Sequence, residues 1–321
     1  KEQKQMTQRK LDIPEVQQIP QFMKIMDDLS VGNNPYLVGS AGTGKTTLGE
    51  KVAYAINGRS ENDGKELPFT IVNCNQWTSP IDIKGGQTIS GYKEGALIEA
   101  WRDGKILILD EMPKLDANTA GLLNDALAKS AREDAIIFNG QNEPIVKHRG
   151  FGCIATGNVI GKGASGNYVG NNKQDASLLD RFSGSIYRIG FNETLERQLV
   201  YAPVVNMCID IRKAILRYEG KEAGDDDTED IMTLRTMLNL ERAYELEMKR
   251  ETGMKDEFGK TYRKMPNGKT LKDALESYFI AMNREKAEHI KTEVNLEGFL
   301  NSYKGSVMKA EFIKEFKRRI G

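Results

Sequence analysis

The chain of 321 residues is poor in the side chains that build most metal centres and nucleophilic triads. Its two histidines, His148 and His289, are too few and too isolated for a histidine-based zinc site or a catalytic triad. Its three cysteines, Cys74, Cys153 and Cys208, show neither C-x-x-C pairing nor metal-ligand spacing. Cys74 and Cys153 lie in apolar, strand-like runs, so we interpret the cysteines as small buried hydrophobic residues rather than reactive thiols.

The chain also lacks an excess of either charge and any long apolar run. Lys and Arg together number 46, and so do Asp and Glu, so no overall positive charge indicates a nucleic-acid binder. A net charge of zero is still compatible with a local cluster of Lys and Arg. The sequence has no run of 18 apolar residues and no signal-peptide pattern, which predicts a cytoplasmic protein without a membrane partner. Because the sequence begins with Lys1 and not with Met, a leader sequence upstream of it is an open alternative.

The segment from Gly39 to Thr46 reads G-x-x-x-x-G-K-T, the pattern of a phosphate-binding P-loop. An apolar run over 35–38 precedes it and a helix-like stretch over 47–55 follows it, as a strand–loop–helix unit requires. We expect Lys45 to reach the β and γ phosphates of ATP, and the Thr46 hydroxyl to ligate Mg²⁺. The expected nucleotide-binding residues of this segment are Gly39, Ala41, Gly42, Thr43, Gly44, Lys45, Thr46 and Thr47.

Strand-like runs alternate with helical stretches through the first 190 residues. The runs cover 36–38, 69–74, 106–109, 152–155 and 186–189. This alternation predicts an α/β fold with a mainly parallel sheet between helices. From residue 192 onward the pattern is almost wholly helical, including an amphipathic stretch over 307–320. We therefore expect a helical segment over 1–30, a nucleotide-binding α/β domain over 31–190, and a helical lid and extension over 191–321.

Three polar sites follow predicted strands or helices. Asp110 and Glu111 end the strand over 106–109, where Asp110 can hold Mg²⁺ and Glu111 can activate water. Asn158 follows the strand over 152–155 and is expected to orient the attacking water through its amide. Arg181, in Leu-Leu-Asp-Arg-Phe, suits an arginine finger, but its spacing alone fits a surface ion pair equally well.

The order of these motifs resembles that of the AAA+ ATPases, and within them the branch of the MoxR, CbbQ and CobS proteins. The segments that carry the closer resemblance cover 81–86, 92–100, 138–148 and 155–182, the last being most like CobS of cobaltochelatase. The resemblance implies one hairpin inserted in the second helix and another before the strand that carries Asn158. It also implies a ring, expected to be a hexamer, in which Arg181 reaches a neighbour's nucleotide, and a sensor arginine at Arg235. An ordinary exposed helix arginine is an open alternative for Arg235.

Two features depart from that pattern. Lys84 stands where the family usually has an apolar residue, and the Gly- and Asn-rich segment 162–175 has no role that the sequence assigns. The predicted reaction is Mg²⁺-dependent hydrolysis of ATP. The resemblance implies that it remodels a protein partner, such as a von Willebrand A-domain protein, and metal insertion as with CobS is one form of this work. A motor acting on nucleic acid is the alternative; a module that binds nucleotide without hydrolysis is disfavoured by Asp110, Glu111 and Asn158.

Overall fold

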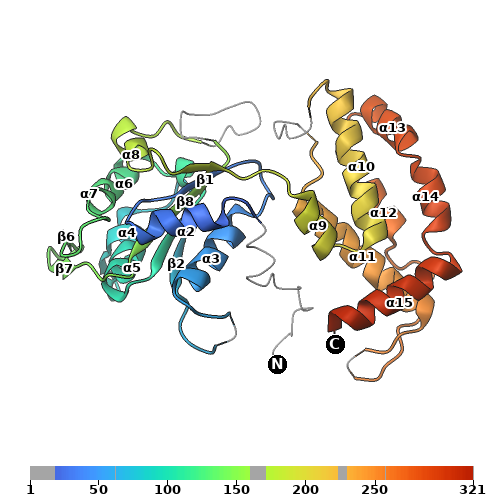
Figure 1. Cartoon of the computed structure of the whole chain (residues 1–321), viewed down its shortest axis with the longest axis horizontal. Helices are drawn as coiled ribbons and strands as arrows, with labels where there is room; N and C mark the ends of the chain where they lie inside the picture. Colours follow the sequence, from blue (N-terminus) through green and yellow to red (C-terminus); the bar gives the residue numbers. More distant parts are fainter. Residues whose placement is uncertain (1–18, 62, 160–170, 223–229, 257, 321) are drawn as a thin grey trace. The chain divides into compact units, whose positions relative to one another are not determined.

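A computed structural model describes residues 19–61, 63–159, 171–222, 230–256 and 258–320 (Figure 1). Contacts between Cα atoms divide the chain into two units, residues 1–190 and 191–321. The helices of the first unit are α2 (Phe22–Ser30), α3 (Lys45–Ile56), α4 (Pro80–Lys84), α5 (Ala96–Asp103), η1 (Met112–Lys114), α6 (Ala117–Gly121), α7 (Leu123–Ala128) and α8 (Ala176–Asp180). Its strands are β1 (Tyr36–Val38), β2 (Phe69–Asn73), β3 (Gly86–Thr88), β4 (Gly91–Lys93), β5 (Ile106–Asp110), β6 (Ile136–Phe138), β7 (Pro144–Val146), β8 (Gly152–Gly157) and β9 (Ile186–Arg188).

Five strands of the first unit form one parallel sheet in the order β2-β5-β8-β1-β9. The central strands β5 and β8 are apolar almost throughout, because helices cover both faces of a parallel sheet and leave no face for water. The five strand-like runs of the sequence all belong to this sheet. The predicted α/β fold with a mainly parallel sheet is therefore confirmed.

Alternate side chains of the strands enter two separate cores. Ile106 and Ile108 pack with α2 and α3 on one face, whereas Leu107 and Leu109 pack with α5, η1 and α7 on the other. The blue helices α2 and α3 lie together in front of the sheet in Figure 1. This alternation, with a period of two residues, fixes which face of the sheet each strand residue meets.

Two antiparallel hairpins extend the first unit. Strands β3 and β4 pair between α4 and α5, and β6 pairs with β7 before β8 begins. Both hairpins occur where the resemblance to the AAA+ branch implied them. The stretch 138–148 thus contains β7 and the end of β6.

The second unit is helical in the residues that the structure describes. Its helices are α9 (Glu193–Leu199), α10 (Ala202–Tyr218), α11 (Leu234–Thr252), α12 (Leu271–Ile280), α13 (Arg284–Glu293), α14 (Leu296–Ser302) and α15 (Ser306–Ile320). Aromatic rings of three of its segments, Tyr201, Tyr244 and Phe312, contact one another in the core. The buried guanidinium of Arg212 donates to both carboxylate oxygens of Glu196, at 3.0 and 2.7 Å.

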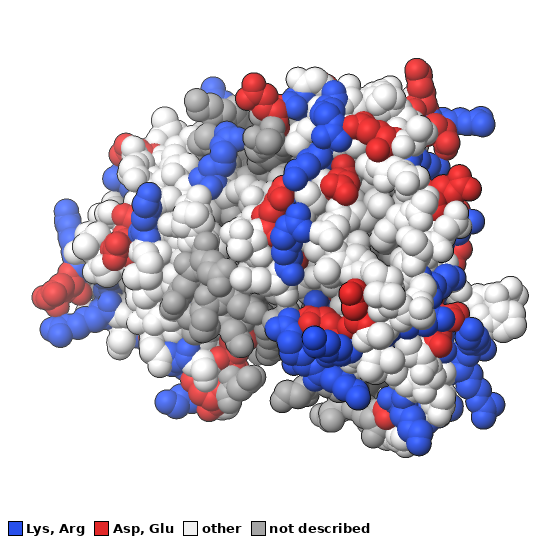
Figure 2. Space-filling model, turned by 45° about the vertical axis from the view of Figure 1, so that its right-hand side comes forward, with Lys and Arg blue, Asp and Glu red and all other residues white. Residues whose placement is uncertain are grey.

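All three cysteines are buried and unpaired, which confirms their interpretation as core residues. Burial is the main cause that raises the pKa of each thiol, so none is activated as a nucleophile. Within the described residues, no helix is long and apolar enough to cross a membrane. Figure 2 shows both signs of charge interspersed over much of one face, with a denser group of Lys and Arg in its lower half.

Candidate nucleotide site

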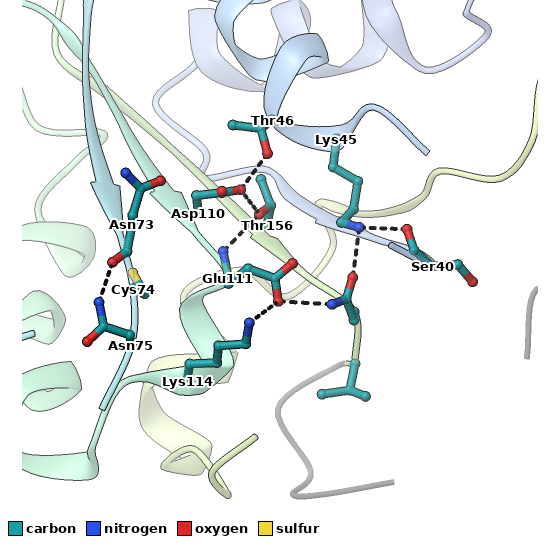
Figure 3. Close-up of polar contacts among 12 residues, drawn as sticks. Ser40, Lys45, Thr46, Asn73, Cys74, Asn75, Asp110, Glu111, Lys114 and Thr156 are labelled. Atoms are coloured by element: carbon teal, nitrogen blue, oxygen red, sulfur yellow. Dashed lines mark hydrogen bonds and ion pairs between the residues drawn. The ribbon is translucent and has the colours of Figure 1, made fainter. Parts of the chain in front are cut away.

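The carboxyl ends of β1, β5 and β8 bring the predicted site residues together (Figure 3). Lys45 and Thr46 begin α3 directly after the loop that follows β1, whereas Asp110 ends β5. Asn158 follows β8, which pairs with both β1 and β5. Ligand sites of parallel sheets lie at this edge, so the topology accounts for the convergence of residues that are more than a hundred positions apart in sequence.

The P-loop conformation depends on two of its glycines. Gly44 has a φ of 86°, in the left-handed region that favours glycine, and caps the amino end of α3. A Cβ at Gly39 would lie 2.1 Å from the carbonyl oxygen of Ile189, so only glycine fits there. The amino end of α3 thereby faces the loop, and the N–H groups of its first turn, together with the helix dipole, favour a bound phosphate.

Lys45 is buried and its ammonium is held at the centre of the site. Its Nζ donates to the carbonyl oxygens of Gly39 and Ser40, at 2.8 and 2.9 Å, and to Oδ1 of Asn158 at 2.9 Å. From separate motifs, Lys45 was predicted to reach the β and γ phosphates and Asn158 to orient the attacking water. The structure brings these two side chains into direct contact.

Asp110 joins the P-loop to the sheet through two hydroxyl groups. Thr46 Oγ1 donates to Asp110 Oδ1 at 2.5 Å, and Thr156 Oγ1 donates to the same oxygen at 2.7 Å. A hydroxyl and a carboxylate at this spacing are hard oxygen ligands of the kind that Mg²⁺ takes beside substrate phosphates. Thr46 and Asp110 therefore fit the predicted magnesium site. Thr156 is fully buried and orients the carboxylate.

Glu111 has an unusual backbone conformation, with a φ of 58°. A non-glycine residue in this region is strained and persists only where its surroundings hold it. Its backbone N–H donates to Thr156 Oγ1 at 3.0 Å, and its Oε2 accepts from Asn158 Nδ2, also at 3.0 Å. The Lys114 ammonium lies 3.5 Å from the same oxygen. The carboxylate is thus held between an amide and a cation at the edge of the site (Figure 3).

Two residues fix the turn that follows Glu111. Both lie in residues 171–175, the described part of the Gly- and Asn-rich segment 162–175. Asn172 donates its backbone N–H to Pro113 O at 2.7 Å and its amide to Lys114 O and Leu115 O, at 3.2 and 3.0 Å. The buried Gln174 amide donates to Pro113 O at 3.2 Å and to Leu115 O at 3.0 Å. These five hydrogen bonds, which we call the η1 clamp, connect the Glu111 turn to the start of α8.

The two predicted arginines are not among the residues gathered here. Arg181 is half-buried at the end of α8, and its Nε is buried without a hydrogen-bond partner among the described residues. Its backbone carbonyl accepts from the buried amide of Asn34, which anchors the end of α8. Arg235 is exposed in the first turn of α11, in the second unit. The roles of both arginines stay predictions.

Sequence reasoning missed Thr156, Lys114, Asn172 and Gln174. Thr156 was detectable, since it lies two residues before Asn158 at the end of a predicted strand. Lys114 lies only three residues after Glu111, so its contact is local. Asn172 and Gln174 act across about sixty positions of the chain, through contacts that no local pattern encodes. Tyr36 was also missed: its hydroxyl donates to Val159 O at 2.6 Å, and burial, followed by the charge of Glu111, raises its pKa.

Comparisons with known proteins agree with this arrangement. Residues 35–182 match the family model described as AAA domain (dynein-related subfamily). An uncharacterized protein of Staphylococcus haemolyticus is 31% identical over 162 residues, 48% of this chain and 54% of that protein. The midasin of Giardia intestinalis is 27% identical over 176 residues, 44% of this chain and 4% of that protein. The chain therefore spans about half the length of the staphylococcal relative and a small part of the midasin.

Among solved structures, NtrX from Brucella abortus in complex with ATP is similar with a TM-score of 0.47 and 16% identity. The similarity covers 98% of this chain and 69% of that chain. The family match spans the P-loop, Asp110, Glu111, Asn158 and Arg181. Between residues 35 and 182 the chain is therefore similar to the AAA domain of the dynein-related subfamily, and this stretch contains the P-loop and four strands of the parallel sheet, β2, β5, β8 and β1.

Proposed function

We propose that this chain hydrolyses ATP to ADP and phosphate in a Mg²⁺-dependent reaction. The observation that carries the proposal is the continuous network from Thr46 through Asp110 and Thr156 to Glu111. It joins a phosphate-binding loop, a candidate metal ligand and a candidate base at one sheet edge. A site that only bound nucleotide would not need a carboxylate held in a strained backbone conformation beside the phosphate site.

Each residue of the network has a separate task in this proposal. The backbone of Gly39, Ala41, Gly42, Thr43 and Gly44, continuing through Thr47, cradles the phosphates, while Lys45 exchanges its carbonyl contacts for phosphate oxygens. Thr46 and Asp110 hold Mg²⁺, which offsets charge on the β and γ phosphates. Glu111 accepts a proton from water as that water attacks the γ phosphate, and Asn158 aligns Glu111 and Lys45.

We further propose that the active form is a homo-oligomeric ring, a hexamer, in which Arg181 completes the site of a neighbouring copy. The family resemblance supports this arrangement. So does the position of Arg181, whose Nε is unpaired among the described residues and whose helix end is anchored by Asn34. A positioned arginine that stabilises charge in the transition state is worth roughly 10³–10⁵ in rate. Arg235 is proposed as a nucleotide sensor from the second unit.

The mechanical work of the ring is proposed to be the remodelling of a protein partner, as in the MoxR and CobS branch. A von Willebrand A-domain protein, or a chelatase subunit, is the partner that the resemblance implies. A motor that acts on nucleic acid is the competing function. A positively charged surface of the second unit, described in the next subsection, favours binding of nucleic acid by this chain.

A phosphate-release assay tests the ATPase proposal. We expect turnover by the parent chain, loss of nucleotide binding in Lys45→Ala, and retained ATP binding without turnover in Glu111→Gln. Glu133→Gln, an exposed carboxylate with the same change of charge, is the control and keeps parental activity. Parental turnover by Glu111→Gln would refute the assignment of the base.

Mixing variants tests the ring. An Arg181→Ala chain lacks a finger but has an intact nucleotide site, whereas a Lys45→Ala chain has the reverse defect. Mixed rings therefore contain some complete sites if Arg181 acts on a neighbour, and activity returns in proportion to the mixing ratio. No recovery at any ratio would count against action between copies while leaving the ATPase assignment intact.

A further inference from the structure

Positive charge in this neutral chain is concentrated in two segments of the second unit. Residues 249–269 and 306–320 together contain twelve Lys and Arg against five Asp and Glu, although the whole chain has 46 of each. The first segment covers the end of α11 and the loop to α12, and the second is α15. A local excess of seven positive charges is hidden by the balanced total.

The two segments lie against each other at the end of α11. The Lys249 ammonium lies over the rings of Tyr262 and Phe316, 5.6 and 4.6 Å from their centroids. Glu251 accepts from Lys264 of the loop at 2.9 Å and from Lys309 of α15 at 3.0 Å. Their charges therefore combine into one surface.

The described acids of this region are mostly occupied, whereas many of its described cations are not; Glu257 lies outside the described residues. Glu251 and Glu315 are in ion pairs, and Asp256 accepts from the backbone N–H groups of Phe258 and Lys260. Glu311 is an exposed acid on α15. Six exposed cations of these two segments make no ion pair with any described residue; one of them, Lys269, lies just before α12. The other five, together with Phe258, define what we call the basic surface: Lys255, Lys260, Arg263, Lys314 and Lys317.

A small hairpin presents an aromatic ring among these cations. Lys255 and Thr261 pair across it, Asp256 N–H donates to Lys260 O at 2.8 Å, and Tyr262 N–H donates to Met254 O at 2.7 Å. Phe258, at the tip between the paired positions, is 86% exposed. A flat ring that is open to solvent on a hydrogen-bonded turn offers a face on which a nucleic-acid base can stack.

The composition of the basic surface decides which kind of partner fits. Four of its five cations are lysines, a residue that is depleted in protein–protein interfaces. Single-stranded nucleic acid requires unpaired cations for its phosphates and exposed rings on which bases stack. We propose that the basic surface binds single-stranded DNA or RNA, with Phe258 stacking on a base. This inference goes beyond the ATPase proposal and does not depend on hydrolysis.

Fluorescence anisotropy of a labelled thirty-nucleotide oligo(dT) with the full chain tests the inference. The triple variant Lys255→Glu, Lys260→Glu, Arg263→Glu should weaken binding about ten-fold or more at low salt, and reduce the slope of log Kd against log salt by about two. The matched control reverses three exposed cations on other helices of the same unit, Lys213→Glu, Lys272→Glu and Arg284→Glu, and should change Kd by about two-fold.

The ring has a separate test. Phe258→Ala should weaken binding about five-fold or more with an unchanged salt slope, whereas Phe258→Trp should preserve it, because stacking does not involve counterions. Phosphate release measured without oligonucleotide should be unchanged in every one of these variants. If the chain does not bind nucleic acid, the ATPase proposal therefore stays intact. Absence of binding at low salt, equal binding by the triple variant, or equal displacement by poly-glutamate would each overturn the inference; the last would indicate an acidic polypeptide partner.

Discussion

The η1 clamp offers a direct test of how the chain controls its candidate base. Gln174→Ala removes two hydrogen bonds, from Gln174 Nε2 to Pro113 O and to Leu115 O. Each contributes about 1 kcal/mol net, which sets the gross loss at about 2 kcal/mol. Neither carbonyl becomes unpaired, because Asn172 still donates to both.

A second effect reduces that loss. The Oε1 atom of Gln174 is buried without a partner among the described residues, so its removal relieves a desolvation cost. We therefore expect Gln174→Ala to lower the free energy of unfolding of the first unit by about 1–2 kcal/mol. Both tryptophans, Trp77 and Trp101, belong to this unit, so their fluorescence during urea denaturation reports it selectively.

The catalytic consequence is more specific than the loss of stability. The left-handed conformation of Glu111 costs about 1–3 kcal/mol and depends on the turn that the clamp holds. If the clamp positions Glu111, kcat should fall about ten-fold, since that factor corresponds to about 1.4 kcal/mol. KM for ATP should stay within about two-fold, because the P-loop contacts are untouched. Steady-state phosphate release measures both constants.

Two controls make this prediction decisive. Gln141→Ala removes an exposed glutamine from the β6–β7 turn and should leave both constants unchanged. On a Glu111→Gln background, Gln174→Ala should cause no further loss of turnover, because residues that act as one unit are not additive. An unchanged kcat, or an equal further loss on that background, would refute the proposed link between the clamp and Glu111.

Three further predictions concern other parts of the chain. Chelating Mg²⁺ with EDTA should abolish phosphate release, and titration with Mg²⁺ should restore it; turnover in EDTA would remove Thr46 and Asp110 from the metal site. Arg212→Ala strands the buried carboxylate of Glu196 and should destabilise the second unit by about 3–5 kcal/mol, measured by circular dichroism in urea; a loss below about 1 kcal/mol would contradict a stabilising pair. Hydrogen bonding to Arg318, and next to Arg319, lowers the Glu315 pKa from its ordinary 4.5 to about 2. The stabilisation of the folded state by the charged Glu315 is present above pH 4.5 and is lost as the pH falls toward 2. The difference in Tm between the parent chain and Glu315→Gln should therefore be smaller at pH 3 than at pH 6. A difference in Tm that does not change with pH would exclude the charge of Glu315 as its cause.

Local sequence patterns were sufficient for the sheet and for the predicted residues that lie together in the site. The strands over 36–38 and 106–109 are short apolar runs, the first bounded by Pro35 and Gly39 and the second by Lys105 and Asp110. The observed β1 and β5 begin at the same positions as these runs. Parallel strands place their carboxyl ends on one edge, so a polar residue after each run is enough to predict that Lys45, Asp110 and Asn158 converge. The unassigned segment 162–175 had no such periodicity, and residues 160–170 lie outside the described part of the chain.

The sequence by itself determined the chemistry of the site, because glycine positions, strand ends and the lysine of the P-loop act through contacts close to the backbone that carries them. Only the tertiary structure decided what holds that chemistry in place. Thr156 acts on Asp110 across 46 positions of the chain, and Gln174 acts on the Glu111 turn across about sixty. The basic surface likewise exists only because α15 folds against the end of α11, which joins charges that the total composition cancels. Contacts of this kind depend on packing between distant segments, and no local residue pattern encodes them.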